Sequence, residues 1–156
     1  MSQLTEGSPL TGFSCEPDPD NPGWLRWRII DATRFNEAVI GKQLVRAEGP
    51  KSARFRILPQ VPLHTNSAGN VHGAITLALI DISLFGALYV LGGLDAGRSV
   101  TLDLQNQFIG AGDASRPLDS VVELLRETRR LAFMRGLVMQ DDDLVASFTA
   151  TIRKPS

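Results

Sequence analysis

The sequence predicts an α+β domain, in which a curled antiparallel β-sheet wraps one long central helix. Residues 74–94 form an almost wholly apolar run with a single charge, Asp81, near its middle. A run of this kind is typical of a helix that is buried on nearly every side. Residues 99–152 alternate between apolar and polar positions, which indicates strands with one buried face. We therefore expect the strands and the helix to cover each other.

A membrane span is the alternative for the apolar run, because the run is long enough to cross a bilayer. However, an Asp near the centre of a span costs roughly 2.5–3.5 kcal/mol on insertion scales. Neither flank of the run is rich in Lys or Arg, and the strand sequence that follows needs a partner to cover it. We therefore expect a core helix and no membrane partner.

The N-terminal segment differs in composition from the rest of the chain. Residues 1–22 are rich in Pro, Asp, Ser and Gly, and we expect them to form a poorly ordered arm. A single domain then covers residues 23–156. Within it, residues 23–30 are expected to form a short strand, with Trp24 and Trp27 as anchors against the core or a second subunit.

A short helix is expected over residues 32–40, with Asp31 or Thr33 as its N-cap and Gly41 at its end. Two strands should follow, at residues 42–48 and 52–59, joined by a Gly-Pro turn. In the second of these, Phe55 and Ile57 alternate with Arg54 and Arg56, which predicts one buried face and one basic face.

The alternation of apolar and polar residues, together with turn residues, predicts the strands after the long helix. In the first of them, Val100, Leu102 and Leu104 are expected on one face, with Thr101, Asp103 and Gln105 on the other. An acidic turn at residues 141–143 precedes the last strand. The expected strands cover residues 99–109, 118–130, 131–140 and 144–152.

The composition of the chain excludes several classes of function. The chain has 156 residues and a net charge of −1, which gives no electrostatic basis for binding nucleic acid. Its one cysteine, Cys15, excludes a framework of internal disulfides, and we expect an incidental surface thiol. His64 and His72 have no carboxylate at ligand spacing, so no metal site is expected. No secretory signal is visible at the N-terminus, and the cytosol is the expected compartment.

The start of the long helix carries the main functional signal. Turn residues from Asn66 to Gly73 lead directly into the apolar run. The backbone N–H of Gly73 is among the first four of the helix, which have no partner within it. Those donors and the positive end of the helix dipole stabilise an anion or a developing oxyanion. A carboxylate, Asp81, follows on the same helix.

These residues resemble the signature of the hotdog-fold thioesterases, and specifically of the PaaI-type acyl-CoA thioesterases. The matching pattern is Asn66-x-x-Gly69-x-x-His72-Gly73-Ala74 followed by Asp81, and the resemblance covers roughly residues 41–154. Ala74 stands where the family usually has a second Gly, which bears on the range of substrates. The resemblance implies a hotdog fold and hydrolysis of an acyl- or aryl-CoA thioester, with no cofactor, because coenzyme A is part of the substrate.

The resemblance also implies roles for individual residues. The Gly73 N–H would polarise the thioester carbonyl, and Asp81 would act either as general base or as nucleophile. Asn66 would orient the water or the carboxylate, Thr101 would help to position the water, and His72 would support the loop or contact substrate. Ala74 and Phe85 are further candidates for contact with the substrate. Arg129 and Arg130, between two strands, would either bind coenzyme A phosphates or form a charged solvated turn.

Geometry adds a requirement of its own. Gly73 and Asp81 are eight residues apart, so along one helix they are separated by roughly 12 Å. They cannot both contact one thioester carbonyl within a single chain. We therefore expect a homodimer at minimum, with a homotetramer left open, and a reaction site shared by two subunits, as the family resemblance also implies.

Two other functions on the same fold remain open at this stage. An enoyl-thioester hydratase or dehydratase would need an Asp and a His close together near the helix start, whereas the acid of this helix lies two turns further on. A non-catalytic dimer that binds acyl thioesters would keep the pocket without needing both Asp81 and Asn66.

Overall fold

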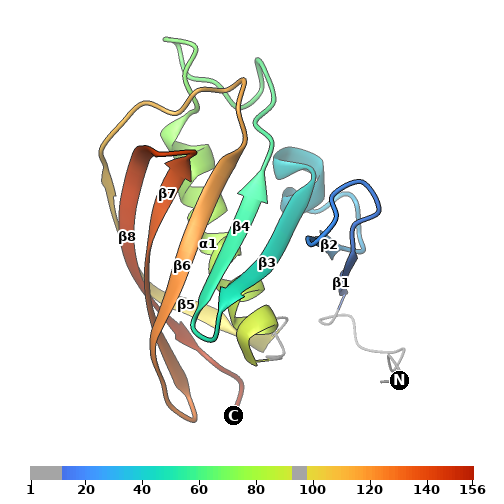
Figure 1. The fold of residues 1–156 in the computed structure, drawn as a ribbon, viewed down its shortest axis with the longest axis vertical. Helices are drawn as coiled ribbons and strands as arrows, with labels where there is room; N and C mark the ends of the chain where they lie inside the picture. Colours follow the sequence, from blue (N-terminus) through green and yellow to red (C-terminus); the bar gives the residue numbers. More distant parts are fainter. Residues whose placement is uncertain (1–11, 93–97) are drawn as a thin grey trace.

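A long helix lies inside a curled sheet in the computed structural model, which describes residues 12–92 and 98–156 (Figure 1). Helix α1 (Gly73–Gly92) packs against one face of an eight-stranded antiparallel sheet, so the predicted fold class is confirmed. The strand order is β1-β2-β3-β4-β6-β7-β8-β5, which makes β1 and β5 the two edges. The strands are β1 (Phe13–Pro17), β2 (Leu25–Ile29), β3 (Gln43–Gly49), β4 (Ser52–Ile57), β5 (Val100–Phe108), β6 (Leu118–Glu127), β7 (Leu131–Gln140) and β8 (Asp143–Arg153).

Helix α1 is buried along most of its circumference, as an apolar run without a polar face requires. Gly86 allows close packing against the sheet, because a Cβ at this position would lie 2.5 Å from Cε2 of Phe55 on β4. One side of the helix is left exposed or half-buried. This exposed stripe of α1 consists of Ala74, Leu77, Ala78, Asp81 and Phe85.

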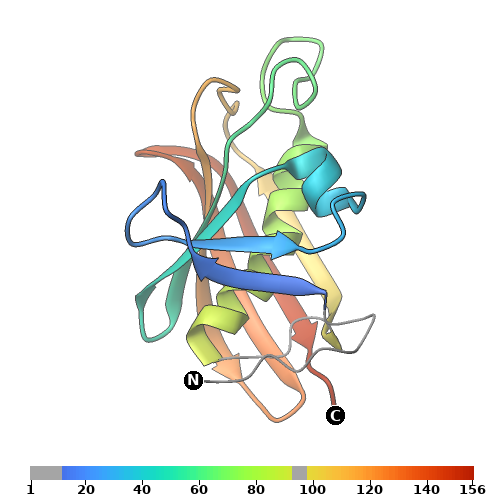
Figure 2. The ribbon, with the colours of Figure 1, turned by 90° about the vertical axis from the view of Figure 1, so that its right-hand side faces the viewer.

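By length and composition alone, α1 could cross a membrane, and 56% of the apolar window is buried inside the structure. The edge hairpin of β1 and β2 passes across α1 and completes the enclosure on one side (Figure 2). This burial is what the core helix of a folded domain shows.

The two faces of the sheet have different compositions. Phe55 and Ile57 are fully buried, and Arg54 and Arg56 stand on the opposite face of β4, as predicted. Both arginines donate to the carboxylate of Asp119 on β6, at 3.0 Å and 2.7 Å respectively. The outer face of the sheet is therefore an ion-pair network rather than a purely basic surface.

Trp24 and Trp27 are both buried and act as anchors, on opposite faces of the sheet. Trp24 lies beneath the guanidinium groups of Arg46 and Arg56, at 4.3 Å and 4.7 Å from its ring centroid. Trp27 belongs to the hydrophobic core.

The expectation of a poorly ordered arm is corrected where the structure describes that segment. Phe13–Pro17 forms β1, which pairs with β2 and packs Phe13 and Cys15 against the core. Of the polar and Pro-rich residues that suggested disorder, residues 18–22 lie in the turn between β1 and β2. Residues 1–11 lie outside the described residues.

The expected helix over residues 32–40 is only partly correct. The regular segment, η1 (Asn36–Ile40), is shorter and is a π-type turn, with Phe35 and not Asp31 or Thr33 at its N-cap. The Asp31 carboxylate accepts from the Thr33 N–H at 3.0 Å, so it closes a local turn before the helix instead of capping it. Gly41 ends the segment, as predicted, with a φ of 82°.

The predicted strand faces of β5 are wrong at its start. A bulge between Thr101 and Asp103 makes Leu102 an extra residue relative to β8. An inserted residue reverses the alternation, so Thr101 faces the helix together with Leu104 and not opposite to it. The predicted end of α1 at residue 94 lies outside the described residues.

Gly136 on β7 should be intolerant of any side chain. A Cβ there would lie 2.3 Å from the Val121 carbonyl oxygen and 2.3 Å from Cζ of Phe148, whose ring covers the glycine. Because a backbone atom is involved, we expect Gly136→Ala to lower the free energy of unfolding by about 3 kcal/mol. Urea unfolding measures this loss. Gly49→Ala on β3, where a Cβ would meet nothing within 4 Å, is the matched control, and equal stability of both variants would contradict the expectation.

Candidate active site

Asp81 stands in the middle of α1 with its carboxylate at the edge of a cavity. The Thr101 hydroxyl donates to Asp81 Oδ1 at 2.7 Å, which fixes the carboxylate from the neighbouring strand β5. The cavity has a volume of about 200 Å³. This Asp81 cavity is lined by Phe13, Trp27, Ile29, Asn36, Asp81, Ile82, Phe85 and Ser99.

Gly73, at the first position of α1, presents a free backbone donor. The N–H groups of Ile75 and Thr76 donate to the carbonyl of His72, and the N–H of Ala74 donates to His72 Nδ1 at 2.9 Å. Within the described part of the chain, the Gly73 N–H has no acceptor. His72 therefore caps the helix, and the unpaired Gly73 N–H is available to a ligand at the positive end of the helix dipole.

Asn66 shapes the loop before the helix. Its Oδ1 accepts from the N–H groups of Ala68 and Asn70, at 3.0 Å and 3.1 Å, while Gly69 takes a φ of 80°. The Asn66 amide nitrogen makes no hydrogen bond within residues 12–92 and 98–156, so it can still donate to a ligand.

A buried histidine holds this loop to the core. His64 is fully buried, and its Nδ1 accepts from the Gln60 N–H at 3.0 Å while its Nε2 pairs with the Val39 carbonyl. Its carbonyl accepts from the His72 N–H at 2.8 Å. The loop is therefore tied to η1 on one side and to the start of α1 on the other.

Gly73 and Asn66 line a second cavity, of about 220 Å³, that Asp81 does not reach. Phe108 on β5 forms one wall, with Cζ only 3.2 Å from where a Cβ of residue 73 would stand. The second cavity, the Gly73 cavity, is lined by Asn66, Asn70, Val71, Gly73, Thr76, Phe108, Gly110, Ala111, Gly112 and Val145. Within one chain, the amide donor and the carboxylate therefore belong to separate cavities on the same side of α1.

Sequence comparison decides the family. A family model described as the acyl-CoA thioesterase N-terminal domain matches residues 61–153, which include both cavities' residues on α1 and β5. The chain belongs to the acyl-CoA thioesterase family. A comparison with curated proteins finds no significant match.

Solved structures confirm the hotdog fold of this thioesterase. Thioesterase superfamily member 2 from zebrafish is 22% identical, with a TM-score of 0.67 over 80% of this chain and 89% of that chain. A mutant of the phenylacetic acid degradation protein PaaI from Thermus thermophilus is 24% identical, with a TM-score of 0.64 over 78% and 98%. A hypothetical thioesterase from Streptococcus pneumoniae, solved with coenzyme A, is 19% identical, with a TM-score of 0.65 over 76% and 90%.

The remaining predicted residues of the thioesterase are dispersed. Phe85 lines the Asp81 cavity, and Ala74 is exposed on the stripe of α1. Arg129 and Arg130 lie in the exposed turn between β6 and β7, which is at the opposite end of the molecule from the start of α1 (Figure 1). Arg130 joins a cleft of about 460 Å³ whose charged residues are Arg98, Arg130, Arg153 and Lys154, whereas Arg129 does not line it.

Cys15 is not the surface thiol that composition suggested. It is half-buried on β1 and packs against the core, and burial raises the pKa of its thiol to about 11. The thiol is therefore protonated near neutral pH and is a poor nucleophile. Among the described residues, no three His, Cys, Asp or Glu side chains group in a way that could hold a metal ion.

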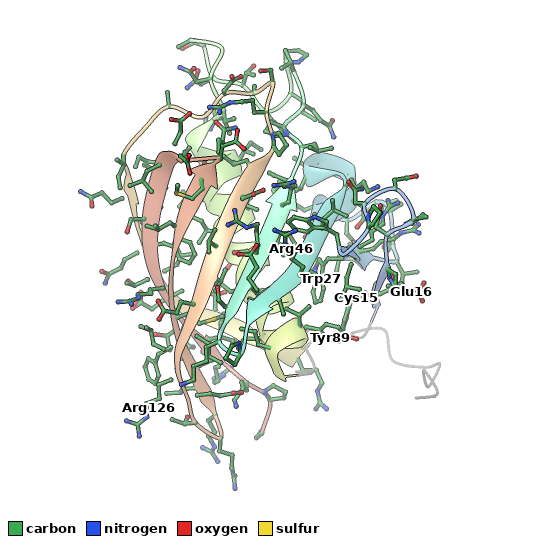
Figure 3. All side chains as sticks on the ribbon, in the orientation of Figure 1. Cys15, Glu16, Trp27, Arg46, Tyr89 and Arg126 are labelled. Carbon is green, nitrogen blue, oxygen red and sulfur yellow. The ribbon has the colours of Figure 1, made fainter. Side chains whose placement is uncertain are left out.

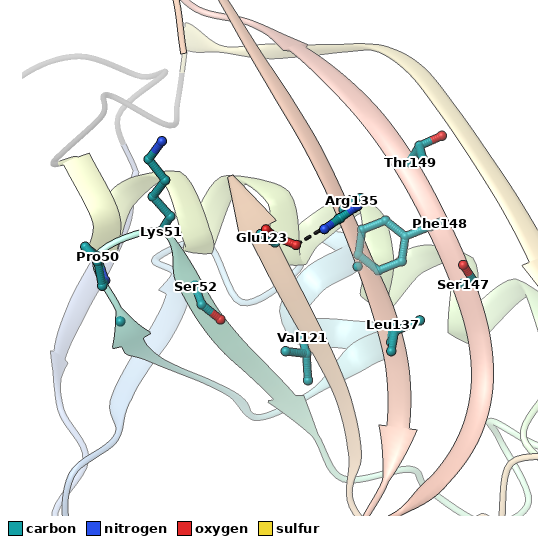
Figure 4. A pocket seen from close by; sticks show the side chains of 12 residues that line it. Pro50, Lys51, Ser52, Val121, Glu123, Arg135, Leu137, Ser147, Phe148 and Thr149 are labelled. Atoms are coloured by element: carbon teal, nitrogen blue, oxygen red, sulfur yellow. Dashed lines mark hydrogen bonds and ion pairs between the residues drawn. The ribbon is translucent and has the colours of Figure 1, made fainter. Parts of the chain in front are cut away.

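A larger hollow, of about 740 Å³, lies on the face of the sheet away from α1 (Figure 4). The ion pair of Arg135 with Glu123, at 2.8 Å, stands within it, and Leu137 forms part of its floor. None of the predicted site residues lines this hollow, so we do not place the site of the thioesterase there.

Sequence reasoning missed half of the Asp81 cavity. Phe13, Trp27, Ile29 and Asn36 come from the first forty residues, before the region that the family model matches. Trp27 was expected only as an anchor. Pairing of β1 with β2 places Phe13 beside Trp27. The Pro- and Asp-rich composition around β1 gave no indication of this strand.

Proposed function

We propose that this thioesterase hydrolyses the thioester bond of an acyl- or aryl-CoA to the free acid and coenzyme A, in a site that two copies of the chain build together. The observation that supports the proposal is the division of the site. Asp81, which accepts from the Thr101 hydroxyl, lines one cavity, and Gly73 and Asn66 line another. Gly73 and Asp81 are roughly 12 Å apart along α1.

A two-fold rotation axis between two chains would bring the Gly73 half of the site and the Asp81 half together. In a symmetric dimer, a contact between Gly73 of one copy and Asp81 of the other occurs twice. The helices must then run antiparallel, and the axis passes the midpoint of these residues, which is Leu77. Leu77 is 38% exposed in the single chain, although an apolar side chain on a core helix gains from burial. A second copy would bury it against its own equivalent.

The position of strand β5 fits the same axis. Thr101 contacts Asp81 and Phe108 contacts Gly73, so the same rotation sets Thr101 of one copy opposite Phe108 of the other. The two β5 strands would pair antiparallel about residues 104 and 105. β5 is an edge strand with an open backbone, and an open edge is a ready template for such pairing. Exposed apolar side chains on β5 and directly after it would be covered: Val100, Leu102, Phe108 and Ile109.

Thioester hydrolysis can then proceed between Gly73 of one chain and Asp81 of the other. The thioester carbonyl oxygen accepts from the Gly73 N–H, which stabilises the oxyanion as the carbonyl carbon becomes tetrahedral. In the general-base route, Asp81 of the partner subunit takes a proton from water as the water oxygen bonds to that carbon. In the nucleophilic route, the carboxylate itself bonds to the carbon, and water later cleaves the mixed anhydride. In both routes the C–S bond breaks, and the coenzyme A thiolate leaves and is protonated.

Neighbouring residues support this step. Thr101 holds one oxygen of the Asp81 carboxylate, which leaves the other to face the reacting carbon. The unpaired amide N–H₂ of Asn66 lies in the Gly73 cavity and can donate to the water or to the partner's carboxylate. His72 contributes indirectly, because it caps the start of α1 and leaves the Gly73 N–H free.

The phosphates of coenzyme A require cations, and the cleft at Arg130 offers them. Arg98, Arg130 and Arg153 lie there, and the Lys154 amine is paired with Glu127 at 2.7 Å. Guanidinium groups bind phosphate oxygens by charge-assisted hydrogen bonds. The structure of the related Streptococcus pneumoniae protein with coenzyme A supports coenzyme A as the carrier group. We place the reaction in the cytosol.

Hydrolysis of a panel of acyl-CoAs, followed by detection of the free thiol, tests the function. We expect thiol release from at least one member of a series of short, medium, long and aryl acyl-CoAs. Absence of release from all of them would refute hydrolysis. Hydration of an enoyl-CoA without thiol release would indicate the hydratase class instead.

A crosslink at Leu77 tests the two-fold axis. In a Cys15→Ser background, Leu77→Cys should give a covalent dimer with a short bismaleimide linker, because the introduced thiols meet at the axis. Asp142→Cys, exposed in the turn between β7 and β8, is the control and should remain monomeric on a denaturing gel. Failure of the Leu77→Cys variant to crosslink, at concentrations where it is active, would contradict the arrangement.

A further inference from the structure

We propose that the hairpin of β1 and β2 sets the size of the acyl group that this thioesterase accepts, with Phe13 closing the Asp81 cavity. The inference rests on the proposed function, because it assigns the acyl group to the cavity beside Asp81. It adds a specificity element from a part of the chain that precedes the family match at residue 61.

The Asp81 cavity is mostly apolar. Asp81 provides the carboxylate at one edge, and most of the other lining side chains are apolar or aromatic: Phe13, Trp27, Ile29, Ile82 and Phe85. A substrate with its reactive carbonyl at Asp81 would therefore place an apolar group within this wall. The charged part of the substrate would remain outside.

Aromatic contacts hold the wall of the Asp81 cavity in place. The ring of Phe13 stacks on Trp27, with centroids 4.8 Å apart, and meets Tyr89 of α1 edge-on at 5.4 Å. Tyr89 also contacts Trp27 at 5.6 Å but does not line the cavity, so it supports the wall from behind. Trp27 and Tyr89 lie together at the hairpin end of the sheet (Figure 3). Phe13 cannot turn aside to admit a longer chain without breaking both ring contacts.

Polar contacts attach the hairpin of β1 and β2 to the rest of the fold. At one end, the Ile29 N–H donates to Glu37 Oε1 of η1 at 2.9 Å. At the other, the buried carboxylate of Asp18 pairs with Lys42 at 2.9 Å. The hydrogen bonds from Lys42 and Asn21 lower the pKa of Asp18 to about 2, so the pair persists throughout the pH range of an assay. Both ends of the hairpin are held, and the wall is a fixed part of the cavity.

The volume of the Asp81 cavity limits the size of the acyl group. The cavity measures about 200 Å³. An apolar cavity of about 150 Å³ in another protein holds one benzene molecule. The Asp81 cavity therefore fits an acyl group of about one six-membered ring with a short linker, or an aliphatic chain of similar volume. A long fatty acyl chain exceeds this volume, so it would have to displace side chains of the wall that includes Phe13.

The test compares chain-length profiles. We would measure kcat/KM for a series from acetyl- to palmitoyl-CoA and for benzoyl- and phenylacetyl-CoA, in wild type, Phe13→Ala and Phe13→Trp. Phe13→Ala should raise kcat/KM for decanoyl-CoA about tenfold or more relative to butyryl-CoA. Phe13→Trp should shift the profile toward shorter chains. Phe133→Ala, which removes the same ring from the outer face of the sheet, should leave the profile unchanged.

Binding provides a second readout that does not need turnover. In the Asp81→Asn variant, unhydrolysed acyl-CoAs can be titrated against the tryptophan fluorescence, which includes Trp27 of the cavity wall. Affinity should fall beyond medium chain length in that variant and recover when Phe13→Ala is added. An identical length profile with and without Phe13, in folded protein, would overturn the inference while leaving hydrolysis intact. Absence of thiol release from every acyl-CoA would instead refute the proposed function.

Discussion

Replacing Asp81 by Asn should lower kcat for acyl-CoA hydrolysis about 100-fold or more, because the amide can neither accept the proton from water nor attack the carbonyl. The substitution preserves the size of the side chain and can still accept from the Thr101 hydroxyl, which lies 2.7 Å from Asp81 Oδ1. We therefore expect little change in thermal stability. The measurement is thiol release under substrate saturation, with the melting temperature taken on the same preparation.

Asp142→Asn is the matched control for this prediction. Asp142 is an exposed carboxylate in the turn between β7 and β8, outside both cavities. Its replacement should leave kcat unchanged. Retention of activity within about tenfold in Asp81→Asn would remove Asp81 from the reaction, since loss of a general base costs more.

Replacing Gly73 by Pro should lower kcat by about 10²–10³-fold, the cost of one oxyanion donor. Proline has no N–H, and the first position of a helix tolerates it because its N–H has no partner within the helix. In this chain the Gly73 N–H is free of acceptors within the described residues. The substitution therefore removes the proposed donor without removing a structural hydrogen bond.

Gly73→Ala separates the loss of the donor from the effect of added bulk. Alanine keeps the N–H and adds a Cβ that would lie 3.2 Å from Cζ of Phe108, whose exposed ring can shift. We expect the alanine variant to remain about tenfold or more faster than the proline variant. Equal kcat values for the two would show that the Gly73 N–H does not stabilise the transition state.

The core helix and the position of the acid were predictable because both depend on local sequence. An apolar run without a polar face specifies burial, and a lone carboxylate within it stands out because burying a charge is costly. The loop from Asn66 to Gly73 was equally readable, since turn residues and a helix start are local features. The structure adds that His72 caps the helix, which leaves Gly73 as the free donor.

The contact of Thr101 with Asp81 depends on a pairing that the local sequence does not specify. Simple alternation placed Thr101 on the face opposite Leu104. The bulge between Thr101 and Asp103 is a property of the register with β8, about fifty residues later in the chain. The resemblance to known thioesterases singled out Thr101, but the hydrogen bond to the carboxylate became visible only in three dimensions.

The aromatic wall of the Asp81 cavity was not predictable for a similar reason. Phe13 lies in a segment whose Pro and Asp content indicates an arm, and it meets Trp27 only because β1 pairs with β2. Its contact with Tyr89 joins residues that lie more than seventy positions apart in the sequence. Composition describes the turn that flanks β1 and conceals the strand itself.

Complementation between two inactive variants tests the shared site most directly. Gly73→Pro and Asp81→Asn chains, carrying different affinity tags, would be co-expressed, and the heterodimer would be isolated by tandem purification. Its intact Gly73 and intact Asp81 come from different chains, so one of the two sites is complete and specific activity should return to about half that of wild type. A heterodimer as inactive as its two parent homodimers would show that no site takes its amide from one chain and its acid from the other.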